Sequence, residues 1–339
     1  MKTALITGIS GQDGSYLAEF LLEKGYEVHG IVRRHSVAEN QTARLNSCFD
    51  KLHLHYGDVT DVVSLIQIIQ DCEPIEIYNI AAQSHVRISF DIPVYTANAT
   101  GMGPLHVLEA VRIVNPHIKV YQASSSEMFG NCVDDDGFQR ETTPMRPVSP
   151  YGCAKVFGFN IARNYRHSYN MFISNGILFN HESPRRGSNF VTSKIVQGAI
   201  AIASGKATEL RLGNLDARRD WGHAKDYVEA MWMILQAKEP EDYVCATGIS
   251  HSVRDCCEYV FNKLKLNYKD YVVLDKKYLR PEELHDLKGD ATKIREDLGW
   301  EPKYTFEKLM DDMLINDENY YKAIKFDEEY VHTPYDTCK

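Results

Sequence analysis

The sequence predicts an α/β protein in which a doubly wound parallel sheet is joined to a smaller mixed α/β domain. Three observations lead to this prediction. Short apolar runs rich in β-branched residues alternate with longer helical stretches over the first half of the chain. A glycine-rich turn follows the first of these runs, and the pattern becomes less regular after about residue 180. Such alternation is typical of βαβ units, whose strands pair in parallel.

The first half of the chain supplies the strands of the predicted sheet. They are expected at Thr3–Thr7, Glu27–Val32, His53–Tyr56, Glu76–Asn79, Lys119–Ala123 and Phe172–Ile177. Between the first two, Ser15–Lys24 carries apolar residues at helical spacing and is followed by Gly25, which suits a helix C-cap. The chain from Thr3 to Val32 is therefore expected to form one βαβ unit.

The second half is expected to leave the sheet, return to it and leave it again. A turn at Pro184–Gly187, a helix at 190–204 and an extended segment at 209–212 suggest inserted, substrate-side structure. A helix at Ala224–Gln236 and a strand at Tyr243–Ala246 then return. The predicted cofactor-binding domain comprises residues 1–180 and about 219–248. The substrate-binding domain comprises about 181–218 and 249–339, with a loosely ordered acidic tail at 327–339.

Composition excludes several classes of protein. The 339 residues carry a formal charge of −9, which disfavours nucleic-acid binding, and no apolar run is long enough to span a membrane. The chain begins in the first predicted strand without a signal-peptide pattern, so a cytoplasmic location is expected. The eight cysteines lack zinc-ligand or CxxC spacing, so reduced thiols and no metal site are expected.

The glycine-rich turn predicts a Rossmann-type dinucleotide site. Gly8, Ile9, Ser10, Gly11, Gln12, Asp13 and Gly14 form a GxxGxxG motif between the first strand and the first helix. Glycines allow a tight turn and close approach of the backbone to a pyrophosphate, which the helix N-terminus attracts. The same motif in isolation can be a turn without a ligand, but its position between strand and helix favours cofactor binding.

The ends of the next strands indicate which cofactor is bound. Arg33 ends the second strand where an NAD-binding protein carries Asp or Glu, so the sequence favours NADP and its 2′-phosphate; a solvated arginine or a subunit contact is the alternative. Asp58 and Val59 follow the third strand near the expected adenine. Small residues after the fourth strand allow close approach to the cofactor, although tight packing explains them equally well. This segment comprises Ile80, Ala81, Ala82, Gln83 and Ser84.

Three sequence features predict a set of catalytic residues. Tyr151 and Lys155 are four residues apart, so on a helix both face one site, and the ammonium is expected to lower the pKa of the phenol toward neutrality. Ser125 lies in a hydroxyl-rich run after the fifth strand, at the carboxyl edge of the sheet. Glu127 adds a carboxylate that elimination of water requires as base and acid; a helix cap or a pair with arginine is the alternative.

Long motifs identify a family. The runs Gly8–Leu17, Asn180–Gly187, Leu212–Tyr227 and Arg280–Glu283, together with the Ser–Glu and YxxxK motifs, resemble the GDP-mannose 4,6-dehydratase family of extended short-chain dehydrogenases/reductases. The resemblance covers almost the whole chain. Two departures are His35, where the family commonly carries serine, and a longer connection containing Asp134–Gly137, expected to be a surface loop.

The resemblance implies roles for further residues. It implies that Tyr95, His181 and Arg186 contact NADP, and that Lys155 holds the nicotinamide ribose. The implied GDP-sugar contacts are Ser84, Ser125, Glu127, Tyr151, Asn180, Lys194, Leu212, Gly213, Arg219, Arg280 and Glu283. The arginines suit a diphosphate, although interdomain salt bridges or a buried polar network would also use them.

The resemblance also implies the reaction. GDP-mannose would be oxidised at C4, lose water across C5 and C6, and receive the hydride back at C6, giving GDP-4-keto-6-deoxymannose, the first step toward GDP-6-deoxyhexoses such as GDP-fucose or GDP-rhamnose. The family implies a homodimer or homotetramer. The alternatives are a related nucleotide-sugar epimerase, a dehydratase with added 4-keto reductase activity, and a catalytically silent NADP-binding sensor.

Overall fold

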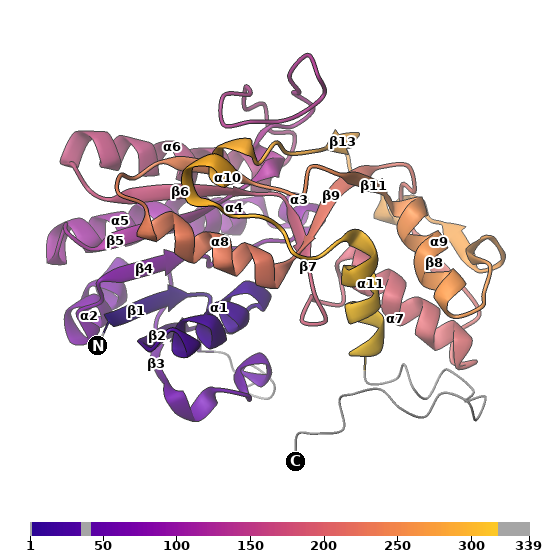
Figure 1. The fold of residues 1–339 in the computed structure, drawn as a ribbon, viewed down its shortest axis with the longest axis horizontal. Helices are drawn as coiled ribbons and strands as arrows, with labels where there is room; N and C mark the ends of the chain where they lie inside the picture. Colours follow the sequence, from indigo (N-terminus) through magenta and orange to yellow (C-terminus); the bar gives the residue numbers. More distant parts are fainter. Residues whose placement is uncertain (1, 35–41, 318–339) are drawn as a thin grey trace.

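The larger part of the protein is a seven-stranded parallel sheet. The computed structural model describes residues 2–34 and 42–317, and the sheet has the strand order β10-β6-β5-β4-β1-β2-β3 (Figure 1). Its strands are β1 (Lys2–Thr7), β2 (Tyr26–Val32), β3 (Leu52–Tyr56), β4 (Glu76–Asn79), β5 (Lys119–Ser125), β6 (Ile173–Leu178) and β10 (Asp242–Cys245). Every neighbouring pair is parallel. The predicted fold class and the six strands of the first half are confirmed.

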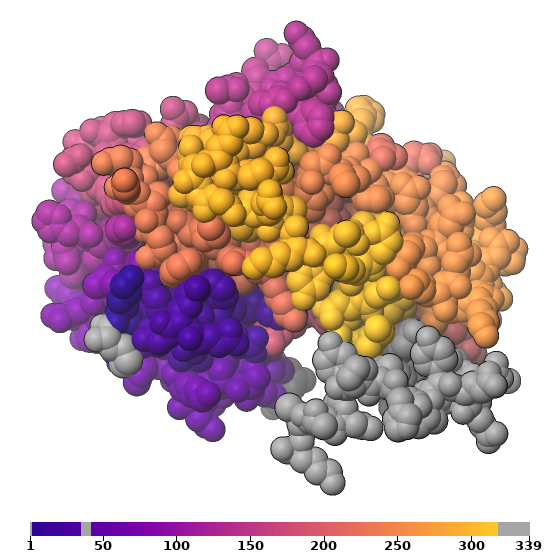
Figure 2. Space-filling view, viewed as in Figure 1, coloured from indigo at the N-terminus to yellow at the C-terminus, as the bar shows by residue number. Residues whose placement is uncertain are grey.

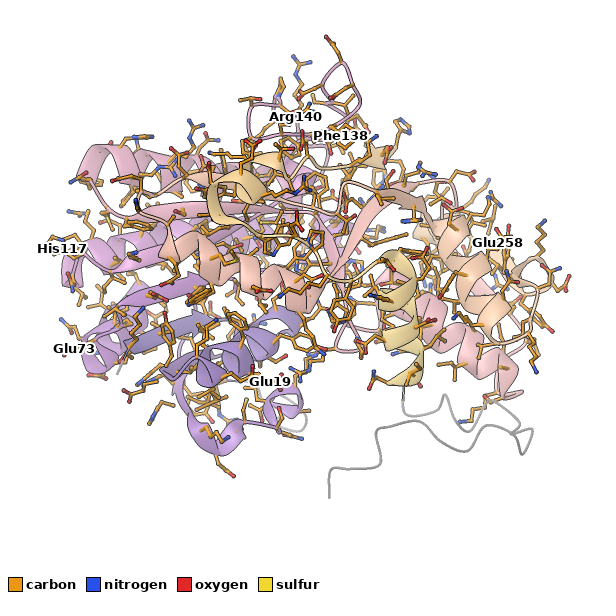
Figure 3. The ribbon with its side chains drawn as sticks, viewed as in Figure 1. Glu19, Glu73, His117, Phe138, Arg140 and Glu258 are labelled. Atoms are coloured by element: carbon orange, nitrogen blue, oxygen red, sulfur yellow. The ribbon has the colours of Figure 1, made fainter. Side chains whose placement is uncertain are left out.

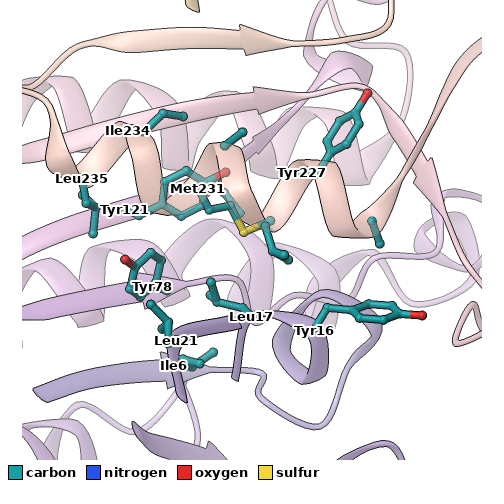
Figure 4. Close-up of a cluster of buried hydrophobic side chains, with 14 of the residues drawn as sticks. Ile6, Tyr16, Leu17, Leu21, Tyr78, Tyr121, Tyr227, Met231, Ile234 and Leu235 are labelled. Atoms are coloured by element: carbon teal, nitrogen blue, oxygen red, sulfur yellow. The ribbon is translucent and has the colours of Figure 1, made fainter. Parts of the chain in front are cut away.

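Helices cover both faces of this sheet. One face packs against α1 (Gln12–Glu23) and α8 (Ala224–Gln236), and Figure 4 shows residues of this cluster, including Leu17 and Met231, around the strand residues Ile6 and Tyr121. The other face packs against α2 (Val62–Cys72), α5 (Gly103–Val114) and α6 (Pro150–Tyr169). The strand order reverses between β1 and β4, the point at which doubly wound sheets bind ligands beyond the carboxyl ends of their strands.

The first helix begins three residues earlier than predicted. Apolar periodicity starts only at Tyr16, but α1 starts at Gln12 and has Gly11 as its N-cap. Its first turn is polar because those side chains bond to another segment rather than to the core: Gln12 accepts a hydrogen bond from Ser183 and Asp13 pairs with His181. Because Gly11 of the phosphate loop is the N-cap, the loop leads directly into the helix without a linker between them.

A second region has its own apolar core. In one sheet, β9 (Arg218–His223) pairs with β7 (Asn180–Glu182), β11 (Ser250–Ser252) and β13 (Asp286–Leu287), while β8 (Leu210–Leu212) pairs with β12 (Val272–Leu274). Its main helices are α7 (Val191–Ala203), α9 (Val253–Lys263) and α11 (Phe306–Ile315). These elements enclose a hydrophobic cluster separate from those of the large sheet. The segment at about 219–248 is predicted to belong to the cofactor-binding domain. Its α8 and β10 do pack with the large sheet, whereas its first residues, in β9, pair with strands of the second region. The exact domain division stays a prediction.

The two regions are joined along one face. In Figure 2 the last described segments, coloured yellow, cross from the large sheet to the second region. They contain α10 (Thr292–Leu298), which contacts β10, and α11, which contacts α7 and α9. The remaining helices of four or more residues, α3 (Val86–Asp91), α4 (Pro93–Thr96) and a π-helical turn (Ala97–Met102), precede α5. None of the helices in the described ranges is long and apolar enough to cross a bilayer.

The predicted Asp134–Gly137 loop is a tethered surface turn. Arg140, labelled beside Phe138 in Figure 3, donates hydrogen bonds to Asp134, Asp136 and Asp290 at 2.9, 2.6 and 2.7 Å. The arginine therefore ties the turn to the chain near α10. His35 and the predicted acidic tail at 327–339 lie outside the described residues.

Candidate active site

A cleft of about 1090 Å³ opens beyond the carboxyl ends of the sheet strands and extends to the second region. The predicted residues that line it are Gly8, Ser10, Gly11, Gln12, Asp13, Gly14, Arg33, Asp58, Val59, Ile80, Ala81, Ala82, Ser84, Tyr95, Ser125, Glu127, Tyr151, Lys155, Asn180, His181, Arg186, Lys194, Leu212, Gly213, Arg219, Arg280 and Glu283. Ile9 lies in the core beneath the loop, and the amide of Gln83 bonds to the His85 carbonyl; neither lines the cleft.

The phosphate loop requires its glycines. Gly8 has a φ of +73°, which favours glycine, and its carbonyl accepts a hydrogen bond from the Gly11 N–H at 3.0 Å. A Cβ on Gly14 would lie 2.3 Å from the Gly8 oxygen and 2.5 Å from the Ile9 Cα. Any side chain there would force the loop open. The result is a close turn that presents the N-terminus of α1 to the cleft, as a pyrophosphate site requires.

A polar network fixes this loop against the strand that follows β6. Asp13 Oδ2 lies 2.8 Å from His181 Nε2, while Ser183 donates to Gln12 at 2.8 Å. Burial alone would raise the pKa of Asp13, but the charge and hydrogen bond of His181 outweigh it and hold the pKa at about 2. Burial alone would lower the pKa of His181, but the charge and hydrogen bond of Asp13 outweigh burial and raise that pKa. His181 thus lines the cleft as one half of an ion pair.

Three arginines line the cleft, namely Arg33, Arg44 and Arg186. Arg33 follows β2 and donates a hydrogen bond to the hydroxyl of Tyr95. Arg186 Nε lies 2.8 Å from Glu182 Oε2. Arg44, which the sequence analysis missed, lines the same cleft and donates to the Arg185 carbonyl at 2.9 Å. No local motif marks Arg44, because it comes from a short helical turn with no periodic pattern; only the fold places it beside the loop.

The predicted Ser–Tyr–Lys group is assembled from β5 and α6. Ser125 ends β5, and Ser149 caps α6 by accepting a hydrogen bond from the Gly152 N–H at 3.0 Å. Tyr151 and Lys155 therefore lie on the first two turns of the helix and face the strand end. The Lys155 ammonium donates to the Ala123 carbonyl at 2.8 Å. Burial lowers the pKa of Lys155 to about 8, although Asp13 acts in the opposite direction.

The prediction that the pKa of Tyr151 is lowered toward neutrality is wrong for the protein without a ligand. Burial raises the pKa of Tyr151 to about 12; a hydrogen bond with Ser125 lowers it, and the charge of Glu127 raises it further. Lys155 does not reverse this, because its ammonium lies 5.7 Å from the Tyr151 ring centroid and bonds to the backbone. A phenolate here needs a further positive charge.

Glu127 is a buried carboxylate with one oxygen held and the other unpartnered. Its Oε1 accepts a hydrogen bond from Arg280 Nη1 at 3.0 Å, so the predicted arginine pair exists. Its Oε2 is buried and has no hydrogen-bond partner among the residues that the structure describes. Glu283 extends the network, at 3.8 Å from Arg280 and 3.4 Å from Arg219. A buried carboxylate oxygen without a partner is suited to receive a proton from a ligand.

The cleft lining also contains a further unpartnered polar atom and a lysine packed on an aromatic ring. Asn180 Oδ1 is buried and lacks a hydrogen-bond partner within residues 2–34 and 42–317. The Lys194 ammonium lies 3.3 Å from the centroid of Tyr278, an aromatic residue that the sequence analysis missed. A Cβ on Gly213 would lie 2.8 Å from the Tyr278 carbonyl, so the glycine permits this close packing. A flat aromatic ring and a cation in contact, as in Tyr278 and Lys194, suit a base and a phosphate.

Comparisons with known proteins identify the family. The family model described as GDP-mannose 4,6 dehydratase matches residues 5–313. The chain belongs to the GDP-mannose 4,6-dehydratase family. It is 52% identical over 328 residues to GDP-mannose 4,6 dehydratase 1 of Arabidopsis thaliana, a match that covers 93% of this chain and 90% of the relative. With the human GDP-mannose 4,6 dehydratase it shares 50% identity over 344 residues, covering 93% and 91%. The family predicted from the motifs is confirmed.

Solved structures of other proteins show the same fold. A dTDP-glucose 4,6-dehydratase from Bacillus anthracis in complex with NAD superposes with a TM-score of 0.81 at 24% identity, covering 97% of this chain and 98% of that one. A UDP-glucose 4-epimerase from Thermus thermophilus in complex with NAD has a TM-score of 0.81 at 23% identity, covering 95% and 100%. At this identity the likeness shows the fold alone. The reaction of this protein must therefore be inferred from the side chains in its own cleft.

Proposed function

We propose that this protein converts GDP-mannose to GDP-4-keto-6-deoxymannose and water. The observation that carries the proposal is the buried Glu127 carboxylate, with its unpartnered Oε2, in the same cleft as Ser125, Tyr151 and Lys155. Oxidation of a sugar hydroxyl needs only the last three residues, whereas loss of water also needs a group that takes one proton and gives another. The relatives with 52% and 50% sequence identity are named GDP-mannose 4,6 dehydratases, which supports the same reaction.

The cleft is suited to a nicotinamide dinucleotide, for which we propose NADP. The close Gly8–Gly14 turn and the α1 N-terminus fit a pyrophosphate, and Asp58 fits the adenine amino group. Arg33, Arg44 and Arg186 line the same cleft, and guanidinium groups favour a 2′-phosphate over a bare hydroxyl. When bound, the nicotinamide would supply the reversible hydride carrier, which takes hydride from C4 and returns it to C6.

Tyr151 would accept the proton of the C4 hydroxyl. Its pKa of about 12 in the chain alone leaves it protonated at neutral pH, so the positive charge of an oxidised nicotinamide nearby would favour the phenolate. Ser125 would donate a hydrogen bond that keeps the phenol and the sugar hydroxyl in line. Lys155, anchored on the Ala123 carbonyl, would hold the ribose.

Glu127 would then move the protons of the elimination. Oxidation at C4 acidifies the C5–H, and the unpartnered Oε2 would take that proton and deliver it to the C6 hydroxyl as water leaves. Arg280 would hold Oε1, so that the carboxylate presents one defined oxygen to the sugar. The same group serves as base and then as acid, so Glu127 returns to its starting charge. The proton that Tyr151 took from the C4 hydroxyl balances the proton that C5 takes up as hydride returns to C6.

The diphosphate and the base would bind at the far end of the cleft. Arg219 and Arg280 lie 3.4 and 3.8 Å from the same oxygen, Glu283 Oε1, so two guanidinium groups are held close together. Such a pair favours a dianionic ligand. Lys194 lies over Tyr278, and the Asn180 oxygen has an unmet hydrogen-bonding capacity that a ligand can fill. We propose that the second region, with these residues, forms the GDP-sugar domain.

Mass spectrometry of GDP-mannose incubated with the protein and NADP⁺ tests the function. We expect a product lighter by one water, formed without net consumption of NADP⁺. A later gain of two hydrogens when NADPH is added would reveal an additional 4-keto reductase. An isomer of unchanged mass would indicate an epimerase, and binding of NADP without any turnover would indicate a silent sensor; either result would contradict the proposal.

A further inference from the structure

A cluster of histidines lies on the edge of the large sheet, away from the cleft. β3 is the terminal strand, and its pairing with β2 places His53 directly beside His29. Alternate residues share one face of a strand, so Glu27 and His29 of β2 lie on the same face as His53 and His55 of β3. None of these four residues lines the cleft. The reaction proposed above does not use them.

Three side-chain donor atoms of this cluster lie close together. The Nε2 atoms of His29 and His53 each lie 3.5 Å from Oε1 of Glu27, and the three donor atoms are all within 4.8 Å of one another. In a tetrahedral zinc site with metal–ligand bonds of about 2.0–2.1 Å, neighbouring donor atoms are roughly 3.3 Å apart. Two of the three separations are therefore close to those of a bound ion.

We propose that Glu27, His29 and His53 form a site for one divalent transition-metal ion, with Zn²⁺ as the best fit. Two imidazoles and one carboxylate suit Zn²⁺, whereas Mg²⁺ and Ca²⁺ prefer oxygen ligands throughout. The three ligands leave a fourth position for water. The site lies across β2 and β3, so the bound ion would tie the edge strand to its neighbour.

His55 prepares His29 for this role. The Nδ1 of His29 and the Nε2 of His55 are 2.9 Å apart. In the tautomer in which His29 carries its proton on Nδ1, that N–H donates to His55 and leaves Nε2 free to bind the metal. Metal-binding histidines commonly use the second ring nitrogen in this way.

The site is open to solvent on one side. The His29 side chain is buried, at 11% exposure, and fixes the inner ligand, whereas His53 is 57% exposed and provides the entry route. The two rings are stacked 4.7 Å apart, only 21° from parallel. Their lone pairs converge on one ion only after His53 rotates about its side-chain bonds, which its exposure permits. We therefore expect binding to order His53 and leave β2 unchanged.

Co²⁺ and Zn²⁺ binding to the full chain, without a polyhistidine tag and after removal of metals by a chelator, tests the proposal. We expect one equivalent of Co²⁺ with a visible spectrum typical of nitrogen and oxygen ligands, displaced by Zn²⁺. A sulfur-to-cobalt charge-transfer band would place the ion on cysteines instead and overturn the proposal, as would failure to bind either metal.

Variants locate the ion. His53→Ala removes an exposed ligand, and Glu27→Gln removes the carboxylate while keeping its shape, so we expect each to weaken binding at least tenfold. His55→Phe removes only the outer hydrogen bond, and we expect about a 10- to 100-fold loss. The matched control is His117→Ala, an exposed histidine near the end of α5 (Figure 3). Equal affinity of His53→Ala and His117→Ala, with both folded by circular dichroism, would refute the site.

Discussion

Replacing Glu127 by glutamine separates oxidation from water loss. The variant keeps the volume of the side chain, and its amide oxygen can still accept the hydrogen bond that Arg280 donates at 3.0 Å. It exchanges the unpartnered Oε2 for an amide nitrogen, which cannot take the C5 proton. The cleft should therefore still bind NADP⁺ and GDP-mannose and still oxidise C4.

The expected loss follows from the role of a positioned acid and base. Such a group contributes about 10²- to 10⁴-fold, so the rate of dehydration should fall by that factor, equivalent to about 3–5 kcal/mol of activation free energy. In a single turnover, absorbance should show the reduced cofactor accumulating, whereas mass spectrometry should find little dehydrated product. In the unaltered protein the reduced cofactor should not accumulate.

Glu283→Gln is the matched control, because Glu283 also lies beside Arg280, at 3.8 Å, but its position gives it no proton-carrying role in the proposed cycle. We expect it to weaken substrate binding without trapping reduced cofactor. Product formed at an unchanged rate by Glu127→Gln would refute the assigned role. The same would follow if both variants lost activity equally and neither accumulated reduced cofactor, since charge near Arg280 would then be the common cause.

Three further outcomes are expected. Tyr151→Phe should bind NADP⁺ normally in calorimetry but lower C4 oxidation at least 10²-fold, because no group remains to take the hydroxyl proton; near-normal turnover would contradict this. Asp13→Asn should cost about 2 kcal/mol in urea denaturation at pH 7, because pairing with His181 lowers the Asp13 pKa from 3.8 to about 2. That difference should vanish as the pH falls from 4 toward 2, and a difference independent of pH would refute the ion pair. Arg44→Ala should raise the Kd for NADP⁺ about tenfold and leave that for NAD⁺ unchanged, as expected for one charge-assisted bond to the 2′-phosphate; equal losses for both cofactors would show that Arg44 does not contact that phosphate.

The sequence by itself determined the features that depend on neighbours along the chain. A βαβ alternation needs only local periodicity, so β1 to β6 and the doubly wound sheet could be predicted. The phosphate loop is a single turn between Thr7 and Gln12, and the Tyr151–Lys155 pair occupies one helical face. The long family motifs then predicted most of the residues that line the cleft.

Only the tertiary structure decided how distant side chains act on one another. Arg280 reaches Glu127 across 153 residues, and His181 reaches Asp13 across 168, so no local pattern could reveal which cation holds which carboxylate. The Tyr151 pKa rises because the phenol is buried, and burial is a property of the packed chain. Arg44 enters the cleft from a segment without a motif.

The histidine cluster shows the same distinction on the sheet edge. His29 and His53 carry no metal-ligand spacing along the chain, and the sequence analysis expected no metal site. The parallel register of β2 and β3 brings them together, and a shift of one residue would turn the ligands of one strand to the opposite face. Local periodicity specifies the elements because it is encoded in consecutive residues. The partners of each charge depend on register and packing, which arise only when the whole sheet forms.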